Sequence, residues 1–136
     1  MDYLERQFKD NAGSLGIEFV GFNESLTPRY PAVVLEPGVT ERQVYGSFKF
    51  QIIPHLTIWV FHARLDTTKR KRTREDLQLV NDIVDFLHND LELGGNMVFC
   101  YVENEEPNVG PGFRKGDIVI GTALYWRGLS QPVNWK

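Results

Sequence analysis

Cysteine is nearly absent from this 136-residue chain: Cys100 is the only one, so no intrachain disulfide can form. It stands in the apolar run 97–102, which predicts a small buried side chain, because no basic or helix-terminal neighbour in the sequence would activate a thiol there. No apolar run approaches the roughly 20 residues that cross a bilayer, and the first residues are charged, unlike those of a signal peptide. We therefore expect a protein made in a reducing cytosol, with no membrane partner.

An excess of charge of one sign is also missing, since 15 basic residues face 18 acidic ones and the net charge is −3. This balance excludes a global attraction to nucleic acid or to anionic lipid. Hydrophobic residues make up 42% of the chain and aromatic residues 12%, which is too much for a disordered protein. A chain of this length suits one domain spanning residues 1–136.

Catalytic and metal-binding patterns are missing as well. His55 and His62 are seven residues apart on a predicted strand, so they should point to opposite faces. His88 follows Asp82 and Asp85 at three-residue steps on a predicted helix, which fits either the solvated side of that helix or a metal-assisted hydrolase. No serine stands in a nucleophile elbow, and no glycine pair has the setting of a phosphate-binding loop. We favour a protein that is not an enzyme and that holds no metal or cofactor.

Two segments have helical periodicity. The shorter, 2–11, places Leu4 and Phe8 four residues apart and should stop near Gly13. The longer, 73–91, should start at a capping Thr73 and stop at Gly94-Gly95. Its expected buried stripe consists of Leu77, Val80, Val84, Leu87 and Leu91, widened by Leu79, Ile83 and Phe86.

The strand pattern predicts an α+β fold: a mostly antiparallel β-sheet with one long and one short helix packed on one face. In the strand 55–63, Leu56, Ile58 and Val60 alternate with Trp59, Phe61 and Ala63, so both of its faces should be covered, the second by a neighbouring element or another chain. The other expected strands are 16–22, 32–35 closed by Pro37-Gly38, 44–52 ended by Pro54, 96–102, and 117–126. Loops are expected at 23–31 and 103–116, and the tail 128–136 should be irregular.

One dense run of positive charge, Lys69-Arg70-Lys71-Arg72-Thr73-Arg74, precedes the long helix. It fits a solvated turn, a contact to nucleic acid, or a contact to an acidic protein surface. The acidic stretch Glu103, Glu105 and Glu106 offers such a surface if copies of the chain meet. Four aromatic residues near expected loops or chain ends suit either contact surfaces or local packing: Tyr45, Phe113, Trp126 and Trp135.

The chain from about Tyr30 to Trp126 resembles the tail terminator (tail-completion, or head–tail joining) proteins of long-tailed bacteriophages. The resemblance rests on the short strand 31–35, the hydrophobic strand 56–62 that ends in His62, and the basic turn before the long helix 76–87. Gly94-Gly95 and two strands flanking a loop complete it. Other small phage neck proteins share much of this outline.

The resemblance implies a homo-oligomeric ring, with six copies expected, that caps the last ring of the tail tube and stops its polymerisation. Its partners would be the tail tube protein and the head–tail connector protein, with DNA passing through the channel without sequence-specific binding, in a virion assembled in the host cytoplasm. Another neck, head-closure or tail-tube protein, or a small nucleic-acid-binding module, remains the alternative. The expected subunit or docking contacts are Lys69, Arg70, Lys71, Arg72, Arg74, Glu105, Glu106, Phe113, Arg114, Lys115 and Trp135.

Overall fold

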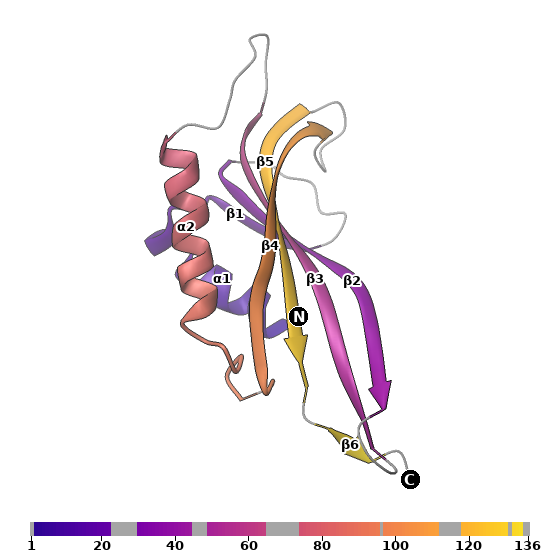
Figure 1. Ribbon diagram of the computed structural model, residues 1–136. Helices are drawn as coiled ribbons and strands as arrows, with labels where there is room; N and C mark the ends of the chain where they lie inside the picture. Colours follow the sequence, from indigo (N-terminus) through magenta and orange to yellow (C-terminus); the bar gives the residue numbers. More distant parts are fainter. Residues whose placement is uncertain are drawn as a thin grey trace.

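The computed structural model describes residues 2–22, 30–44, 49–64, 74–95, 97–111, 118–130 and 132–134. These described residues form one sheet and two helices (Figure 1). The elements are α1 (Asp2–Leu15), β1 (Phe19–Phe22), β2 (Ala32–Val44), β3 (Lys49–Arg64), α2 (Arg74–His88), β4 (Phe99–Pro111), β5 (Ile118–Leu129) and β6 (Val133–Asn134).

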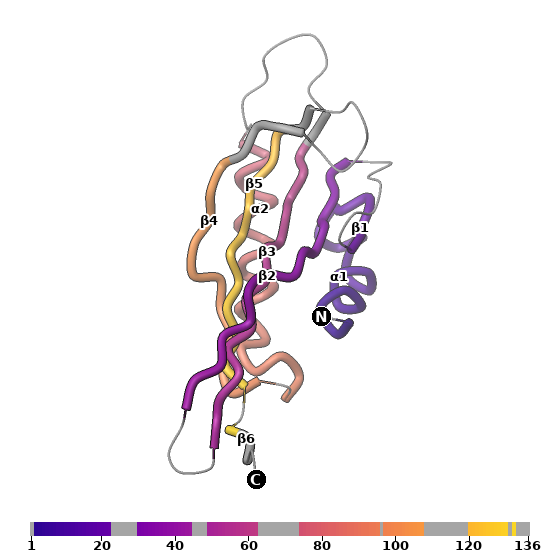
Figure 2. Tube along the Cα trace, turned by 90° about the vertical axis from the view of Figure 1, so that its right-hand side faces the viewer, coloured from indigo at the N-terminus to yellow at the C-terminus, as the bar shows by residue number. Residues whose placement is uncertain are grey.

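The sheet has the strand order β1-β2-β3-β5-β4, and the short β6 pairs with β3. All neighbours are antiparallel except β1 and β2. Both helices lie on the same side of this sheet, and the other side, which faces the viewer in Figure 2, carries no helix formed by the described residues. The predicted α+β fold with helices on one face is therefore confirmed.

The main core lies between the helices and the sheet. Phe8 of α1 and Ile83 of α2 are fully buried there, against Ile58 and Val60 of β3 and Leu124 of β5. The Phe8 and Phe86 rings meet with their centroids 5.3 Å apart. Burial of this apolar surface is the main favourable contribution to folding, and it fixes which side of the sheet is left without a helix.

Helix α1 is longer than the sequence pattern predicts. It continues through Gly13 and ends at Leu15, because Gly16 adopts a left-handed φ of 78°. The Ile17 N–H donates to the Ala12 carbonyl at 2.9 Å and the Gly16 N–H to the Gly13 carbonyl at 3.3 Å. These two bonds are those of a Schellman motif, which satisfies the last carbonyls of a helix.

Helix α2 buries most of the predicted stripe, since Val80, Ile83 and Leu87 are buried and Leu79, Val84 and Phe86 pack partly buried against the core. Its buried residues are Asp76, Val80, Ile83 and Leu87, whereas Leu77 is 44% exposed. The prediction is wrong at the start of the helix, where Asp76 takes the inward position opposite the buried His62 of β3. The helix also ends at His88, before the predicted limit, so the exposed Leu91 belongs to the turn that follows. Thr73, the expected cap, lies outside the described residues.

The two strands β2 and β3 form one long hairpin, which corrects two predicted strand ends. Neither Pro37-Gly38 nor Pro54 stops its strand. The register of the β2–β3 pairing shifts between Pro37 and Thr40, and Thr40 pairs with Pro54. Both prolines therefore lie at an irregularity where the regular pattern of backbone hydrogen bonds is interrupted. The prolines therefore mark a β-bulge within a continuous hairpin.

The predicted loop 103–116 is wrong over its whole described part, 103–111, which belongs to β4. Strand β4 runs on to Pro111 and pairs with β5 along its length, from Phe99 opposite Leu129 to Pro111 opposite Ile118. Polar residues and prolines are tolerated here because β4 is the edge strand of the sheet. The tail also contributes structure, since β6 pairs with Lys49 and Phe50 of β3.

Candidate functional site: an interaction surface

The helix-free face has its own apolar cluster. Ala32, Val34 and Phe61 are buried in it, and Trp59 is partly buried and stacks on Phe61 with ring centroids 6.0 Å apart. The Trp59 Nε1–H donates to the Glu36 carboxylate at 2.6 Å. The predicted division of β3 into two apolar sets is confirmed for Leu56, Ile58 and Val60, which belong to the main core, and for Trp59 and Phe61, which belong to this second cluster.

A row of charged side chains crosses the sheet beside this cluster. His55 of β3 lies between two carboxylates, with its Nε2 3.3 Å from Glu41 of β2 and its Nδ1 3.8 Å from Glu103 of β4. Arg127 of β5 is the cross-strand partner of His55. A hydrogen bond with Tyr101 raises the pKa of Arg127, and the nearby Glu103 and Glu41 act in the same direction. Glu41, His55, Arg127 and Glu103 are called the charged row below.

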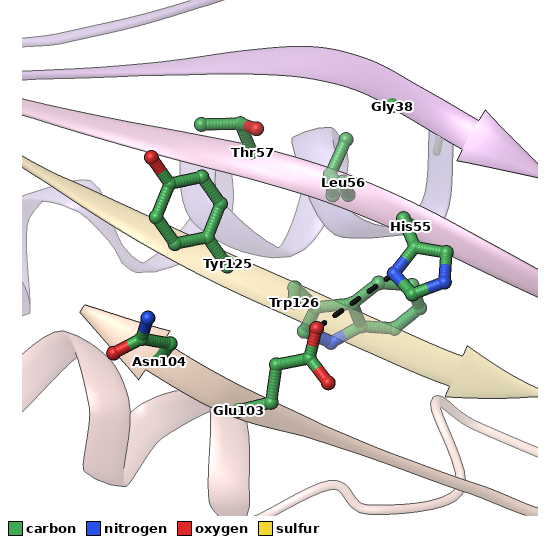
Figure 3. Close-up of a pocket in the computed structure, with 8 residues that line it drawn as sticks. All are labelled: Gly38, His55, Leu56, Thr57, Glu103, Asn104, Tyr125 and Trp126. Carbon is green, nitrogen blue, oxygen red and sulfur yellow. Dashed lines mark ion pairs between the residues drawn. The ribbon is translucent and has the colours of Figure 1, made fainter. Parts of the chain in front are cut away.

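A pocket of about 330 Å³ opens on the charged row (Figure 3). In Figure 3 the His55 ring and the Glu103 carboxylate point toward one another from β3 and β4. The Tyr125 hydroxyl donates to Glu106 at 3.1 Å, and this hydrogen bond raises the Tyr125 pKa because the phenol must stay protonated to donate. The pocket therefore offers carboxylate, amide and hydroxyl groups beside an aromatic ring. Its lining residues are Gly38, His55, Leu56, Thr57, Glu103, Asn104, Tyr125 and Trp126.

The far half of the β2–β3 hairpin projects from the body of the domain (Figure 1). We call residues 37–44 of β2 and 49–55 of β3 the arm. Residues 37–44 are all exposed, with Val39 74% and Val44 65% exposed. β1 pairs with β2 only as far as Leu35, and within the described part of the chain no backbone hydrogen bond joins 38–44 to anything except β3. The outer side of β2 is therefore open to an added strand.

The opposite edge of the sheet, β4, is closed to such pairing. The outward N–H groups of Cys100 and Val102 donate to the Leu91 carbonyl at 2.7 Å and to His88 Nε2 at 3.0 Å. The Glu105 N–H donates to the Asn104 side chain at 2.9 Å. Farther along, Pro107 and Pro111 have no N–H to offer. The two edges thus differ: the arm is open, and β4 is blunted.

The remaining polar groups hold the fold together. His62 is buried, and its Nε2 lies 3.0 Å from the hydroxyl of the fully buried Thr122. Its Nδ1 lies 3.8 Å from Asp76 Oδ1, so this cluster fastens the start of α2 to β3 and β5. His55 and His62 belong to separate clusters, as their spacing predicts. Among the residues that the structure places, no three His, Cys, Asp or Glu side chains form a group that could hold a metal ion, Asp82, Asp85 and His88 included.

The structure describes three of the predicted contact residues. Arg74 is exposed at the start of α2, and Glu105 and Glu106 are exposed on β4. Arg74 makes no ion pair with either glutamate within the described part of the chain. The other predicted contacts lie outside the described residues: Lys69, Arg70, Lys71, Arg72, Phe113, Arg114, Lys115 and Trp135.

Of the two alternatives for the aromatic residues, the structure favours packing for Trp126, and the most distinctive surface features are ones that the sequence does not predict. Trp126 is only 4% exposed and belongs to the main core; Tyr45 lies outside the described residues. The charged row and the open arm could not be found from the sequence, because both depend on which residues face one another across strands. The local signal for them is the polar segment 40–43, which the sequence pattern assigns to no strand.

Burial raises the pKa of the Cys100 thiol to about 11, so the side chain is the buried, inert one predicted.

No helix in the described ranges is long and apolar enough to cross a membrane. No protein-family model matches the chain, and a search of curated proteins finds no significant match.

Proposed function

We propose that this protein is a structural assembly protein of a long-tailed bacteriophage, a tail terminator whose copies form a ring on the last ring of the tail tube. In this role it stops tube polymerisation and offers a surface to the head–tail connector, while DNA passes through the channel. The virion neck is its proposed location. The protein acts by fitting against its neighbours, without bond-breaking.

The observation that carries the proposal is the uneven cover of the sheet. Both helices lie on one face, while the other face holds the Trp59–Phe61 cluster, the charged row and its pocket. Ala32, Val34 and Phe61 of this cluster are buried and Trp59 is partly exposed, so the surface offered to a partner consists mainly of the charged row, its pocket and the Trp59 ring. Charged groups beside a partly exposed aromatic ring are typical of a protein–protein contact.

The arm supports the same proposal. An exposed hairpin carrying Val39 and Val44 can reach a neighbouring subunit, and its open edge can accept a strand from it. A closed ring needs two different patches on each subunit, because a heterologous interface joins one patch to the other. The open arm and the blunted β4 edge make the two ends of the sheet unlike, as such an interface requires.

The decisive experiment is length control of tail tubes. The purified chain is added at increasing ratios to the tube-forming protein encoded with it, and tube lengths are measured by negative-stain electron microscopy. We expect tubes to shorten and to end in a cap as the ratio rises. Tubes of unchanged length at a molar excess of the chain would refute the terminator role.

A second measurement examines the ring itself. Size-exclusion chromatography with light scattering, at low and high protein concentration, gives the mass of the assembly. Rings seen in projection give its symmetry. A chain that stays monomeric both alone and with tubes contradicts the proposal.

A further inference from the structure

The outer edge of the arm presents a defined set of free backbone groups. The Ile52 N–H donates to the Ser130 hydroxyl at 3.0 Å, and the Ile52 carbonyl accepts the Ser130 N–H at 3.0 Å, so both groups of Ile52 point away from β2. Its cross-strand partner Arg42 therefore belongs to a pair without mutual hydrogen bonds, and the N–H and C=O of Arg42 point outward. Because this direction alternates along a strand, the backbone groups of Thr40 and Val44 point outward as well.

An apolar pocket of about 200 Å³ lies beside this edge. Gly38 and Thr40 of β2 line one side of it. Leu4 of α1, Met97 and Trp126 line the other, and all three pack in the main core, so the pocket is on the side of the sheet that carries the helices. A cavity of about 150 Å³ is enough to hold a benzene ring, so this pocket admits the side chain of one leucine, methionine or phenylalanine.

The free backbone groups and the pocket serve the same face of the arm. Thr40 faces the helices, because its partner Pro54 is two residues from Leu56 of the main core and alternate residues share a face. On an added strand, the residue opposite Thr40 lies on this face, next to the pocket. Two residues along, the added strand faces Arg42, which is exposed and makes no ion pair with any described residue. The next position on this face is opposite Val44, which is 65% exposed.

A second copy of the chain fits this edge poorly through the same residues. A two-fold antiparallel pairing that uses all of residues 40–44 is centred on Arg42, and it places the two Arg42 side chains opposite each other. Moving the centre to Glu41 places the two Glu41 side chains opposite each other. Like charges directly opposite each other are destabilising, so the edge suits a strand of a different sequence.

We infer that the open edge of β2 binds an extended segment of a partner protein as an added antiparallel strand, with a large apolar side chain in the pocket beside Thr40 and a carboxylate opposite Arg42. Backbone hydrogen bonds supply the affinity of such a contact, and the pocket and the charge supply its specificity. Read from its N-terminus, the segment has a β-branched residue opposite Val44, an acid two residues later, and leucine, methionine or phenylalanine two residues after the acid. The inference goes beyond the proposed function, because it does not require a ring.

The test measures binding of a peptide to the full-length chain by fluorescence anisotropy. The peptide is Ser-Val-Thr-Glu-Lys-Leu-Ser with blocked ends and a fluorescent label, and its lysine comes opposite Glu41. Replacing its leucine with alanine should weaken binding at least about tenfold, because the pocket is then left unfilled. N-methylation of its glutamate, whose N–H faces the edge, should abolish binding. N-methylation of its threonine, whose N–H faces solvent, should leave the dissociation constant within about twofold.

A charge reversal in the protein tests the register. Arg42→Glu should weaken binding of this peptide by roughly fivefold to tenfold, and it should favour a peptide that carries lysine in place of the glutamate. Arg6→Glu makes the same charge change at an exposed position of α1 and should bind both peptides as the wild type does. Circular dichroism checks that both variants are folded.

The remaining outcomes overturn the inference. Absence of binding up to about 1 mM peptide, or equal loss from the two N-methylated peptides, shows that no strand is added. Unchanged binding of both peptides by Arg42→Glu shows that no acid lies opposite Arg42. If the chain alone forms an assembly that excess peptide dissociates, a second copy occupies the edge in place of a partner protein. The tube-length assay contains no peptide, so the failure of either proposal is seen separately.

Discussion

Gly94 is the position where a single methyl group should have the most readable effect. It adopts a left-handed φ of 62° in the turn after α2, and Gly95 follows with a φ of 90°. A Cβ added to Gly94 would lie 2.6 Å from the Tyr3 hydroxyl oxygen, whereas one added to Gly95 would meet no atom within 4 Å. The two glycines therefore share the backbone strain and differ in the steric contact.

The expected cost of Gly94→Ala has two parts. Left-handed backbone costs a non-glycine residue about 1–2 kcal/mol, and Gly95→Ala should lose this much as well. Gly94→Ala must also push the Tyr3 ring aside, which breaks the 2.9 Å hydrogen bond from Tyr3 to Asp90. A bond of this kind contributes about 1 kcal/mol. We expect Gly94→Ala to lower the free energy of unfolding by about 2–3 kcal/mol.

Urea unfolding followed by tryptophan fluorescence measures the two variants and their combinations with Tyr3→Ala. In the Tyr3→Ala background the extra cost of Gly94→Ala should vanish, giving a coupling energy of about 1 kcal/mol, while Gly95→Ala should show no coupling to Tyr3. Equal losses for the two glycine variants, or an unchanged Gly94→Ala cost without the Tyr3 ring, would refute the reasoning.

Two further predictions concern buried groups. Burial raises the pKa of Cys100 to about 11, so the native thiol should stay protonated and resist a thiol-specific reagent at pH 9, then react fully in urea. The raised pKa should contribute a constant amount to the free energy of unfolding below about pH 9, and this contribution should be lost between pH 9 and 11. The Cys100→Ala variant should lack this decrease with pH. Rapid labelling of the native protein at pH 9 would contradict the prediction. Thr122→Val should cost about 1–3 kcal/mol by leaving buried His62 without its hydroxyl partner, and Thr122→Ser should keep the bond. Equal unfolding free energies for the two Thr122 variants would show that the hydroxyl does not matter.

The spacing of apolar residues along the chain was sufficient to predict whether most elements are helices or strands. Leu4 and Phe8 of α1 are both buried, as their four-residue spacing predicts, and the alternation in β3 correctly divides its side chains between two faces. These predictions succeed because a residue's neighbours on its own element decide which side can be buried. They needed no knowledge of the rest of the chain.

The residues at which the strands begin and end could not be predicted from the spacing of apolar residues. Pro37 and Pro54 looked like strand ends, yet they face a bulge in a hairpin whose other pairs hold it together. The residues 103–111 have the composition of a loop, yet β5 supplies a partner for each of them except Glu103, which lies at a register shift. Pairing between distant strands overrides local propensity, because the hydrogen bonds come from the partner.

The sequence by itself determined the α+β class, the two apolar faces of β3, the buried Cys100, and the position of the basic segment 69–72, since each follows from residue type and spacing. Only the tertiary structure decided the projecting arm, the blunted β4 edge and the charged row. Glu41, His55, Glu103 and Arg127 are up to 86 residues apart (127 − 41 = 86) and meet only through the register of four strands. A one-residue slip in any pairing would send its side chains to the other face, so no local pattern could have assembled this site.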